Sequence, residues 1–397
     1  MAQSLHNDAH HVPPDAETLA WLRLLLTPGI GRITARKLLA KAGGAEEIWQ
    51  LPLPAWAECS TQAQIKALAQ LPPDWNRHCE TLARWLTTPA TGTQHALTYL
   101  GHSQYPDSLL QTEDPPLLLF VQGPEALLNS GAPWFPYPAT LAMVGSRNPS
   151  AQGIINARDM AQALAEQGLC IVSGLARGID AAAHEGALQS KTSKAPSTIA
   201  VVGTGLDQVY PRAHTALAQQ IALHGLVISE YPLGSEPLPR HFPQRNRIIS
   251  GLSQGTLVVE AALQSGSLIT ARLASEQGRE VFAIPGSIHA PQAKGCHALL
   301  RQGAKLVETA ADILDELQGI NMPASPIPQA QAAIKTKVSE QEPELLQALG
   351  HDPMPLDTLM ARTGWDAAHL QAQLMELELD GMVARLPGGL FQRIAHS

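Results

Sequence analysis

Residues 169–188 read LCIVSGLARGIDAAAHEGAL, which joins a short apolar run, a glycine-containing turn and an apolar helical stretch. Every residue from Leu169 to Val172 is apolar, as expected for a strand that is covered on both faces. Gly174 and Gly178 then interrupt the run before the helical pattern begins. A buried strand that leads directly into a helix is the repeating unit of a parallel α/β sheet.

The same alternation recurs along the middle of the chain. Continuously apolar runs are separated by stretches that are long enough for helices of roughly 10–18 residues. This order predicts an α/β fold with a doubly wound, Rossmann-like parallel sheet, and the apolar run at 115–123 predicts one strand before the main set. The other runs are 139–145, 198–203, 226–229, 255–260, 280–286 and 305–307.

Four further segments flank this core, which we place at residues 96–318. Residues 1–17 are predicted to be a disordered N-terminus, and 18–89 a helical domain of the helix-hairpin-helix or SAM-like type. The segment 319–338 is rich in Pro, Ala and Gln without periodicity, which predicts a flexible linker. Residues 339–397 show three helical patterns and a short hairpin pattern, which together predict a winged helix.

The composition argues against several classes of protein. A hydrophobic fraction of 45% is typical of a globular protein, and no apolar run reaches the length needed to cross a bilayer. The first residues lack the basic and apolar regions of a signal peptide. The four cysteines form no CxxC pair, so we expect reduced thiols in a cytoplasmic protein and no metal site. From the short apolar runs we expect no membrane partner.

The distribution of charge matters more than its total. The net charge of −8 by itself argues against nucleic acid. Residues 141–310, however, carry 14 Lys and Arg against 11 Asp and Glu, whereas both flanking parts of the chain are acidic. We therefore expect any polyanion to bind in the middle of the chain.

Glycines, arginines and hydroxyl side chains gather where the predicted strands end. Ligands of open α/β sheets bind outside the carboxyl ends of the strands. Several glycine turns occur here with arginines and a phenylalanine among them. Arginines can bind the phosphates of a nucleic-acid backbone, and an aromatic ring can stack on its bases, so the pattern predicts binding of single-stranded nucleic acid. A nucleotide-type small ligand and purely structural loops are the alternatives. The candidate binding residues are Gly145, Ser146, Arg147, Gly174, Arg177, Arg212, Arg240, Phe242, Arg245, Asn246, Arg247, Ser265, Gly266, Ser267 and Thr270.

Enzymatic functions are less favoured. Gly203 and Gly205 form a GxG but not a GxGxxG, which argues against a dinucleotide site. Glu230 and Glu260 each end a predicted strand, so a nucleotide-binding or nucleotide-hydrolysing enzyme is the alternative function. We expect no catalytic residue and no cofactor.

Asp180 and His184 lie one helical turn apart on one helix face. A metal-binding or acid–base pair is one interpretation of this spacing. The favoured interpretation is an aspartate that caps the helix and a histidine that packs in the interior.

The order of these motifs resembles the DprA/Smf family, the DNA-processing protein A of natural transformation. The resemblance covers residues 96–318 densely, and its runs include SGLARGIDAAAH (173–184), TIAVVGTGLDQVYP (198–211) and PRHFPQRNRIISG (239–251). It implies an extended Rossmann domain that forms a homodimer, binds single-stranded DNA and loads the RecA recombinase. A single-strand-binding protein is a further partner that it suggests. Carried over by motif, the basic contacts are Arg147, Arg212, Arg240, Arg245 and Arg247. The apolar segments 280–286 and 297–300 give loose support for the dimer.

The two flanking domains have weaker signals for DNA. Residues 27–39 look like a helix-hairpin-helix whose Gly29 and Gly31 can direct backbone N–H groups at a phosphate, but a turn that only packs two helices fits the acidic domain better. The third helix of the winged helix, 366–380, carries four acidic residues and no Lys or Arg, so it would repel a phosphate backbone. We therefore favour contact with a protein over DNA binding or mere packing. Its apolar positions, expected to pack, are Leu370, Leu374, Met375 and Leu377.

Overall fold

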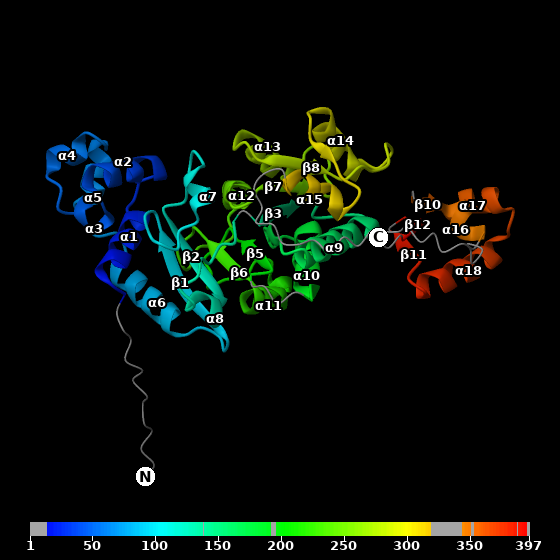
Figure 1. Ribbon diagram of the computed structural model, residues 1–397, viewed down its shortest axis with the longest axis horizontal. Helices are drawn as coiled ribbons and strands as arrows, with labels where there is room; N and C mark the ends of the chain where they lie inside the picture. Colours follow the sequence, from blue (N-terminus) through cyan, green and yellow to red (C-terminus); the bar gives the residue numbers. More distant parts are fainter. Residues whose placement is uncertain are drawn as a thin grey trace, which may run out of the picture.

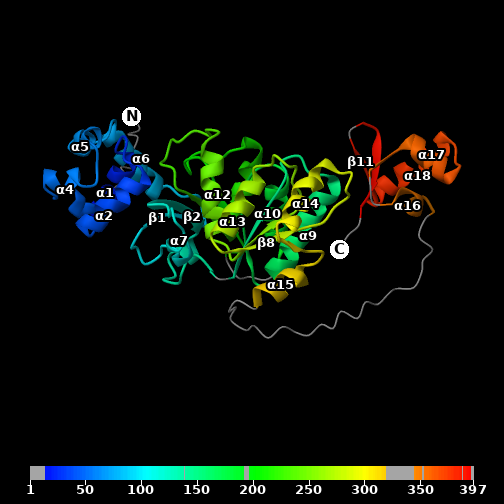
Figure 2. The ribbon, with the colours of Figure 1, turned by 90° about the horizontal axis from the view of Figure 1, so that it is seen from above.

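The computed structural model describes residues 14–137, 139–191, 196–318, 344–350, 353–386 and 388–394. Three bodies follow one another along the chain: a helical domain, an α/β core and a winged helix, with the helical domain and the winged helix at opposite ends (Figures 1 and 2). The predicted linker and residues 1–13 lie outside the described residues. No helix in the described part is long and apolar enough to cross a membrane.

The helical domain begins earlier than expected. Its first helix starts at Ala16, inside the range 1–17 that we expected to be disordered, because the side chain of Asp15 caps it by accepting a hydrogen bond from the Thr18 N–H. Trp21 and Leu38 of this domain share a hydrophobic cluster with Phe120 of the core, so the domain is packed on the sheet. Its helices are α1 (Ala16–Leu26), α2 (Arg32–Ala42), α3 (Ala45–Ile48), α4 (Leu53–Ala57), α5 (Gln62–Leu68) and α6 (Trp75–Thr87).

The core holds a nine-stranded sheet in the order β1-β2-β6-β5-β4-β3-β7-β8-β9. Strands β3 to β9 are mutually parallel where they pair, whereas β2 runs antiparallel to both β6 and β1. The strands are β1 (Thr93–Tyr99), β2 (Leu118–Pro124), β3 (Thr140–Val144), β4 (Cys170–Ser173), β5 (Thr198–Val201), β6 (Leu226–Ser229), β7 (Gly255–Val258), β8 (Glu280–Ala283) and β9 (Lys305–Leu306). The strand β1 was not predicted.

Helices cover both faces of the parallel strands, which confirms the doubly wound fold. Side chains alternate along β3: Leu141 and Met143 join the cluster of one face, and Ala142 and Val144 that of the other. One face is covered by α9 (Ala151–Glu166), α10 (Ile179–Gln189), α11 (Thr215–His224) and α15 (Ala310–Gln318). The other is covered by α12 (His241–Gly251), α13 (Ser267–Glu276) and α14 (Lys294–Arg301). Short helices α7 (Asp107–Leu110) and α8 (Glu125–Leu128) flank β2.

The strand order reverses at β3. From β3 the chain proceeds through β4 and β5 to β6 in one direction, and then returns to place β7 on the other side of β3. The loops that follow β3 and β7 therefore diverge toward opposite faces of the sheet and leave a crevice between them. Such a reversal is the usual ligand site of an open α/β sheet.

The C-terminal body is a winged helix, as predicted. It contains α16 (Glu344–Leu349), α17 (Leu356–Thr363) and α18 (Ala367–Leu379), with a three-stranded sheet of β10 (Met354–Pro355), β12 (Leu390–Arg393) and β11 (Val383–Leu386). Leu370, Leu374 and Leu377 are buried as expected, but Met375 is 64% exposed, so its predicted packing role is wrong. The reason is helical geometry, because Met375 lies off the stripe that the three leucines form.

Candidate nucleic-acid interface

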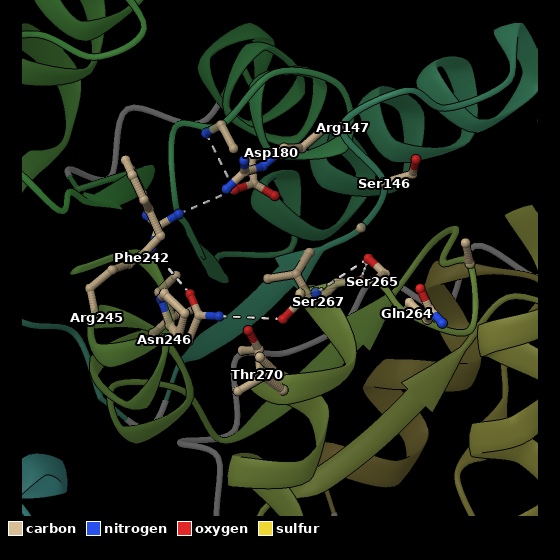
Figure 3. Close-up of a pocket in the computed structure, with 18 of the residues that line it drawn as sticks. Ser146, Arg147, Asp180, Phe242, Arg245, Asn246, Gln264, Ser265, Ser267 and Thr270 are labelled. Atoms are coloured by element: carbon tan, nitrogen blue, oxygen red, sulfur yellow. Dashed lines mark hydrogen bonds and ion pairs between the residues drawn. The ribbon is translucent and has the colours of Figure 1, made fainter. Parts of the chain in front are cut away.

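An open pocket of about 630 Å³ lies at the point where the strand order reverses. The loops after β3 and β7 and the first turns of α12 and α13 converge on it (Figure 3). The structure thus brings together these predicted residues: Gly145, Ser146, Arg147, Phe242, Arg245, Asn246, Ser265, Gly266, Ser267 and Thr270. It also adds Asn148, Tyr210 and Gln264, which the sequence analysis did not single out.

The loop after β3 is held tightly so that Arg147 projects from it. The Ser146 N–H donates to the Glu260 carbonyl oxygen at 2.7 Å, and the Ser146 carbonyl accepts from the Ile179 N–H at 3.1 Å. A Cβ atom on Gly145 would lie 2.6 Å from Cγ1 of Ile179, so only glycine fits there. The backbone is pinned between β7 and α10, and the Arg147 side chain is exposed.

Arg147 and two aromatic rings form the rim of the pocket. The Arg147 guanidinium carbon lies 5.6 Å from the centroid of the Phe242 ring, and the Tyr210 ring centroid lies 5.5 Å from the same ring. Tyr210 is 47% exposed. An exposed ring next to a guanidinium is the arrangement on which nucleobases stack. The sequence held a signal for Tyr210, since an aromatic residue directly precedes Pro211 and Arg212 in the loop after β5.

Arg245 does not fit the phosphate contact expected of it. Its side chain is 4% exposed, and its guanidinium donates to the carbonyl oxygens of Gly174, at 2.5 Å, and of Val201. The carboxylate of buried Asp180 lies 3.9 Å away. Burial lowers the pKa of Arg245 to about 10, so the group stays charged at neutral pH. Its position favours a structural role, in which the guanidinium acts as a strut that ties the ends of β4 and β5 to α12.

Gly174 is explained by the same strut. A Cβ atom at position 174 would lie 2.1 Å from Nη2 of Arg245. The glycine therefore makes room for the buried guanidinium, and Gly174 does not line the pocket. The expectation that it approaches DNA directly is replaced by this packing role.

Arg247 is likewise occupied within the protein. Its Nη2 lies 2.5 Å from Oε2 of Glu230, and its Nε lies 3.1 Å from Oδ2 of Asp114. Burial disfavours the charge of Arg247, but the two carboxylates outweigh that effect and raise its pKa. Arg247 is nearly buried and does not line the pocket, so a phosphate contact is not supported by its position.

Asp114 also joins the helical domain to the core. Nε of Arg32 and Nη1 of Arg36 each lie 2.7 Å from its carboxylate. Burial favours the neutral acid, yet the three guanidinium groups around Asp114 hold its pKa below the ordinary value. Because the arginines of α2 are directed at the core, the geometry favours the packing interpretation of the helix-hairpin-helix segment.

The first turn of α13 forms the opposite wall of the pocket. The hydroxyls of Ser265 and Ser267 are hydrogen-bonded at 2.7 Å, and Nδ2 of Asn246 donates to the Gly266 carbonyl at 3.4 Å. The second bond ties α12 to the start of α13 (Figure 3). The positive end of the α13 dipole faces the pocket, which favours an anion there. Thr270 is buried beneath it.

The remaining three predicted arginines lie beside the pocket and not in its lining. Arg177, Arg212 and Arg240 are exposed, and each stands within two residues of a lining residue, respectively Ala176, Tyr210 and Pro239. They extend the basic surface from the rim along the carboxyl edge of the sheet. Their position suits contacts with a chain of phosphates better than contacts with one small ligand.

The carboxylate Glu260 serves a structural purpose. It accepts hydrogen bonds from the N–H of Ser150 at 2.9 Å and from its hydroxyl at 2.5 Å, at the start of α9. Glu230 is paired with Arg247. Neither Glu260 nor Glu230 lines the pocket, and the carboxylate in its lining is that of Asp180, which pairs with Arg245.

His184 has the character of a packed interior residue. It is 0% exposed, its Nδ1 lies 2.7 Å from the Thr198 hydroxyl, and burial lowers its pKa to about 3. The Thr198 hydroxyl donates to the Ile171 carbonyl, so it accepts from His184. Asp180, one turn earlier, pairs with Arg245 and accepts from the Ala176 N–H. These contacts favour the packing interpretation of His184. The capping role expected of Asp180 is wrong, because the N-cap of α10 is Gly178 without a side-chain cap hydrogen bond, and the Asp180 carboxylate bonds the loop before the helix instead.

The fold and the pocket define an α/β protein of the extended Rossmann-like class, with an arginine-rimmed pocket at its switch point and a winged helix that follows the core in the chain. Residues 96–318 match the family model described as DNA recombination-mediator protein A, and residues 326–389 match the DprA winged helix domain. The chain therefore belongs to the DprA/Smf family, a family of DNA-processing proteins in recombination.

Individual relatives agree with this assignment. Protein Smf of Escherichia coli (strain K12) is 44% identical over 308 residues, which are 77% of this chain and 78% of that protein. DNA processing protein DprA of Streptococcus pneumoniae is 50% identical over 54% of this chain and 71% of that protein. The X-ray structure of DprA from Streptococcus pneumoniae superposes with a TM-score of 0.62 at 38% identity, over 75% of this chain and 97% of that chain. The resemblance inferred from the motifs is confirmed.

Proposed function

We propose that this protein binds single-stranded DNA, without strong sequence preference, across the pocket at the switch point. The observation that carries the proposal is the juxtaposition of Arg147 with the rings of Phe242 and Tyr210, opposite the positive end of α13. Arginine binds the phosphates, and the rings stack bases of any identity. Duplex DNA fits poorly, because its bases are already stacked on each other and cannot reach the rings.

The test of this proposal is the salt dependence of binding. An Arg147→Ala variant is expected to bind a labelled oligothymidylate more weakly, with a slope of log affinity against log salt that is flatter by about 0.7, because one phosphate contact is lost. Fluorescence anisotropy across a salt series measures both quantities. Arg272→Ala is the matched control, since Arg272 is an exposed arginine of α13 outside the pocket. If Arg147→Ala had the affinity and the salt slope of the native protein, the proposal that DNA binds at this pocket would be wrong.

In the cell, the proposed consequence is that the protein protects single-stranded DNA and loads the RecA recombinase onto it, working beside a single-strand-binding protein. The family description as a recombination mediator supports this role. The reaction to measure is RecA-dependent ATP hydrolysis on DNA that is coated with single-strand-binding protein. Stimulation that disappears in Arg147→Ala supports the role, and the absence of any stimulation by the native protein contradicts it.

We also propose that the core forms a homodimer. The segments first suggested for the interface do not serve it, because Phe282, Ala283 and Leu299 are buried in the core. Exposed apolar side chains in the loops after β7 and β8, outside the lining of the pocket, are Leu263 and Ile288. Light scattering is expected to give twice the monomer mass, and Ile288→Asp to shift the mass toward the monomer. A monomeric native protein at high micromolar concentration would overturn the proposal.

The winged helix is proposed to contact a protein. Its third helix, α18, exposes Met375 and Leu379 (80% exposed) beside the acidic Glu376 and Glu378, a surface that repels phosphates. Deletion of residues 321–397 is therefore expected to leave single-strand affinity within about twofold and duplex affinity negligible. Anisotropy with single- and double-stranded oligonucleotides of equal length tests both. If the native protein bound duplex DNA and the deletion abolished that binding, the winged helix would be a duplex-binding domain.

A further inference from the structure

A second cavity, also of about 630 Å³, lies between the helical domain and the end of β1. The strand β1 runs in the same direction as β6, because both are antiparallel to β2. The loop after β1 therefore lies at the same edge of the sheet as the loops of the DNA pocket. The cavity is lined by Glu17, Trp21, Arg36, Leu39, Gly43, Gly44 and residues 99–103.

Aromatic rings and a carboxylate form one wall of this cavity. Trp21 and Tyr99 are stacked with ring centroids 5.0 Å apart, and the His102 ring lies 5.0 Å from Tyr99 at a tilted angle. Nε1 of Trp21 donates to Oε1 of Glu17 at 2.7 Å, which holds the carboxylate beside the rings. Electron-rich ring faces and a fixed carboxylate both attract positive charge.

The C-terminal end of α2 also contributes to the wall of the cavity. Leu39, Gly43 and Gly44 line the cavity there, and the Gly43 N–H bonds to the Leu39 carbonyl to close the helix. The last carbonyl groups of an α-helix carry the negative end of its dipole, so this wall also favours a cation.

The local electrostatics agree with the geometry. Burial and then the carboxylates of Glu17, Asp15 and Glu46 raise the pKa of Tyr99. The one arginine in the lining, Arg36, is engaged by Asp114 and by the Glu113 carbonyl. These contacts direct the Arg36 guanidinium toward the core, and Glu17 is the carboxylate of the cavity lining.

We propose that this second cavity binds an organic cation, a guanidinium or alkylammonium group, between the Trp21–Tyr99 stack, Glu17 and the end of α2. The group belongs either to an arginine or lysine side chain of a protein partner or to a small polyamine. The site does not depend on the DNA pocket, and it places a cation receptor on the same edge of the sheet as the bound polyanion.

The experiment titrates the full-length protein with four probes by calorimetry: agmatine, spermidine, a capped peptide with one arginine, and the same peptide with citrulline in place of arginine. We expect millimolar binding of the cations and none of the citrulline peptide. Glu17→Gln keeps an acceptor for Trp21 Nε1 but removes the charge, and is expected to weaken binding about fivefold. Glu80→Gln, an exposed carboxylate elsewhere in the helical domain, is the control and should bind like the native protein.

The outcomes separate cleanly. Tighter binding of the arginine peptide than of agmatine identifies a protein partner as the source, and the reverse order identifies a small cation. Equal binding of the arginine and citrulline peptides, or equal affinities of Glu17→Gln and Glu80→Gln, would overturn the proposal. The affinity for oligothymidylate, measured on the same variants, should not change. A negative result for cation binding therefore leaves the proposed DNA site unaffected. Tyr99→Leu should lose the cation while its thermal unfolding curve reports whether it folds.

Discussion

Replacement of Arg245 by alanine is expected to lower the free energy of unfolding by about 3–5 kcal/mol, because it leaves a buried carboxylate without its partner. The Gly174 and Val201 carbonyls lose their donor in the same step. Urea unfolding followed by circular dichroism measures the change. Arg147→Ala is the control, and it should alter stability by less than about 0.5 kcal/mol, because its side chain is exposed.

The loss of stability should depend on pH in a definite direction. Burial raises the pKa of Asp180 above 3.8, its value in the unfolded chain, and removal of Arg245 raises it further. A carboxyl group with a raised native pKa contributes stability that is complete below the unfolded value and is lost as the pH rises through the native value. The deficit of Arg245→Ala is therefore smaller near pH 4 than at pH 7. Asp180→Asn in the same variant should restore part of the stability at pH 7.

Arg245 has a competing role that this measurement separates. If Arg245→Ala were as stable as the native protein and yet lost DNA binding, the guanidinium would be a direct DNA contact and the strut would be wrong. If it were destabilised as expected, its effect on DNA binding would follow from the displaced ends of β4 and β5.

Phe242→Ala is expected to weaken the binding of single-stranded DNA about 5- to 150-fold, which corresponds to the loss of one stacked base. Its salt slope should stay that of the native protein, since no charge is removed. The affinity of Arg147→Ala is expected to fall as well, but with a flatter slope, so the slope distinguishes the two variants. Anisotropy with the same oligothymidylate and the same salt series measures both variants.

Phe242→Leu provides the matched control for packing. Leucine keeps an apolar side chain against the pocket wall but removes the aromatic face, so its affinity should fall almost as far as that of Phe242→Ala. Phe242→Trp should bind at least as tightly as the native protein. Native affinity in Phe242→Leu would show that the ring only fills space.

The order of domains and the location of the site followed from local patterns. Each parallel strand is covered on both faces, so it appears in the sequence as an apolar run such as the one that begins at Leu169. The antiparallel strand β1 was missed because Thr93, Gln94, His95 and Thr98 are polar and leave no continuous apolar run. The site could be placed at the carboxyl ends of the strands before the structure was known, since the direction of parallel strands decides where their loops meet.

Local sequence patterns did not predict which arginines are buried. Arg245 and Arg247 look alike in the sequence RNR, and both look like Arg147. Helical spacing offered one hint, since Arg245 falls on the same stripe as the buried Ile248, Ile249 and Leu252. The identity of their partners was not available from any spacing, because Asp114 lies 133 residues from Arg247 and Gly174 lies 71 residues from Arg245.

The sequence by itself determined the parallel strands, the family and the edge of the sheet at which the candidate site is proposed, because apolar periodicity and glycine turns are local properties of the chain. Only the tertiary structure decided which arginines are available to a polyanion. A guanidinium that finds carbonyls or carboxylates in the interior, as Arg245 and Arg247 do, is withdrawn from solvent, whereas Arg147 finds a ring on the surface and keeps its charge exposed. That outcome depends on contacts between residues far apart in sequence, which no local pattern encodes.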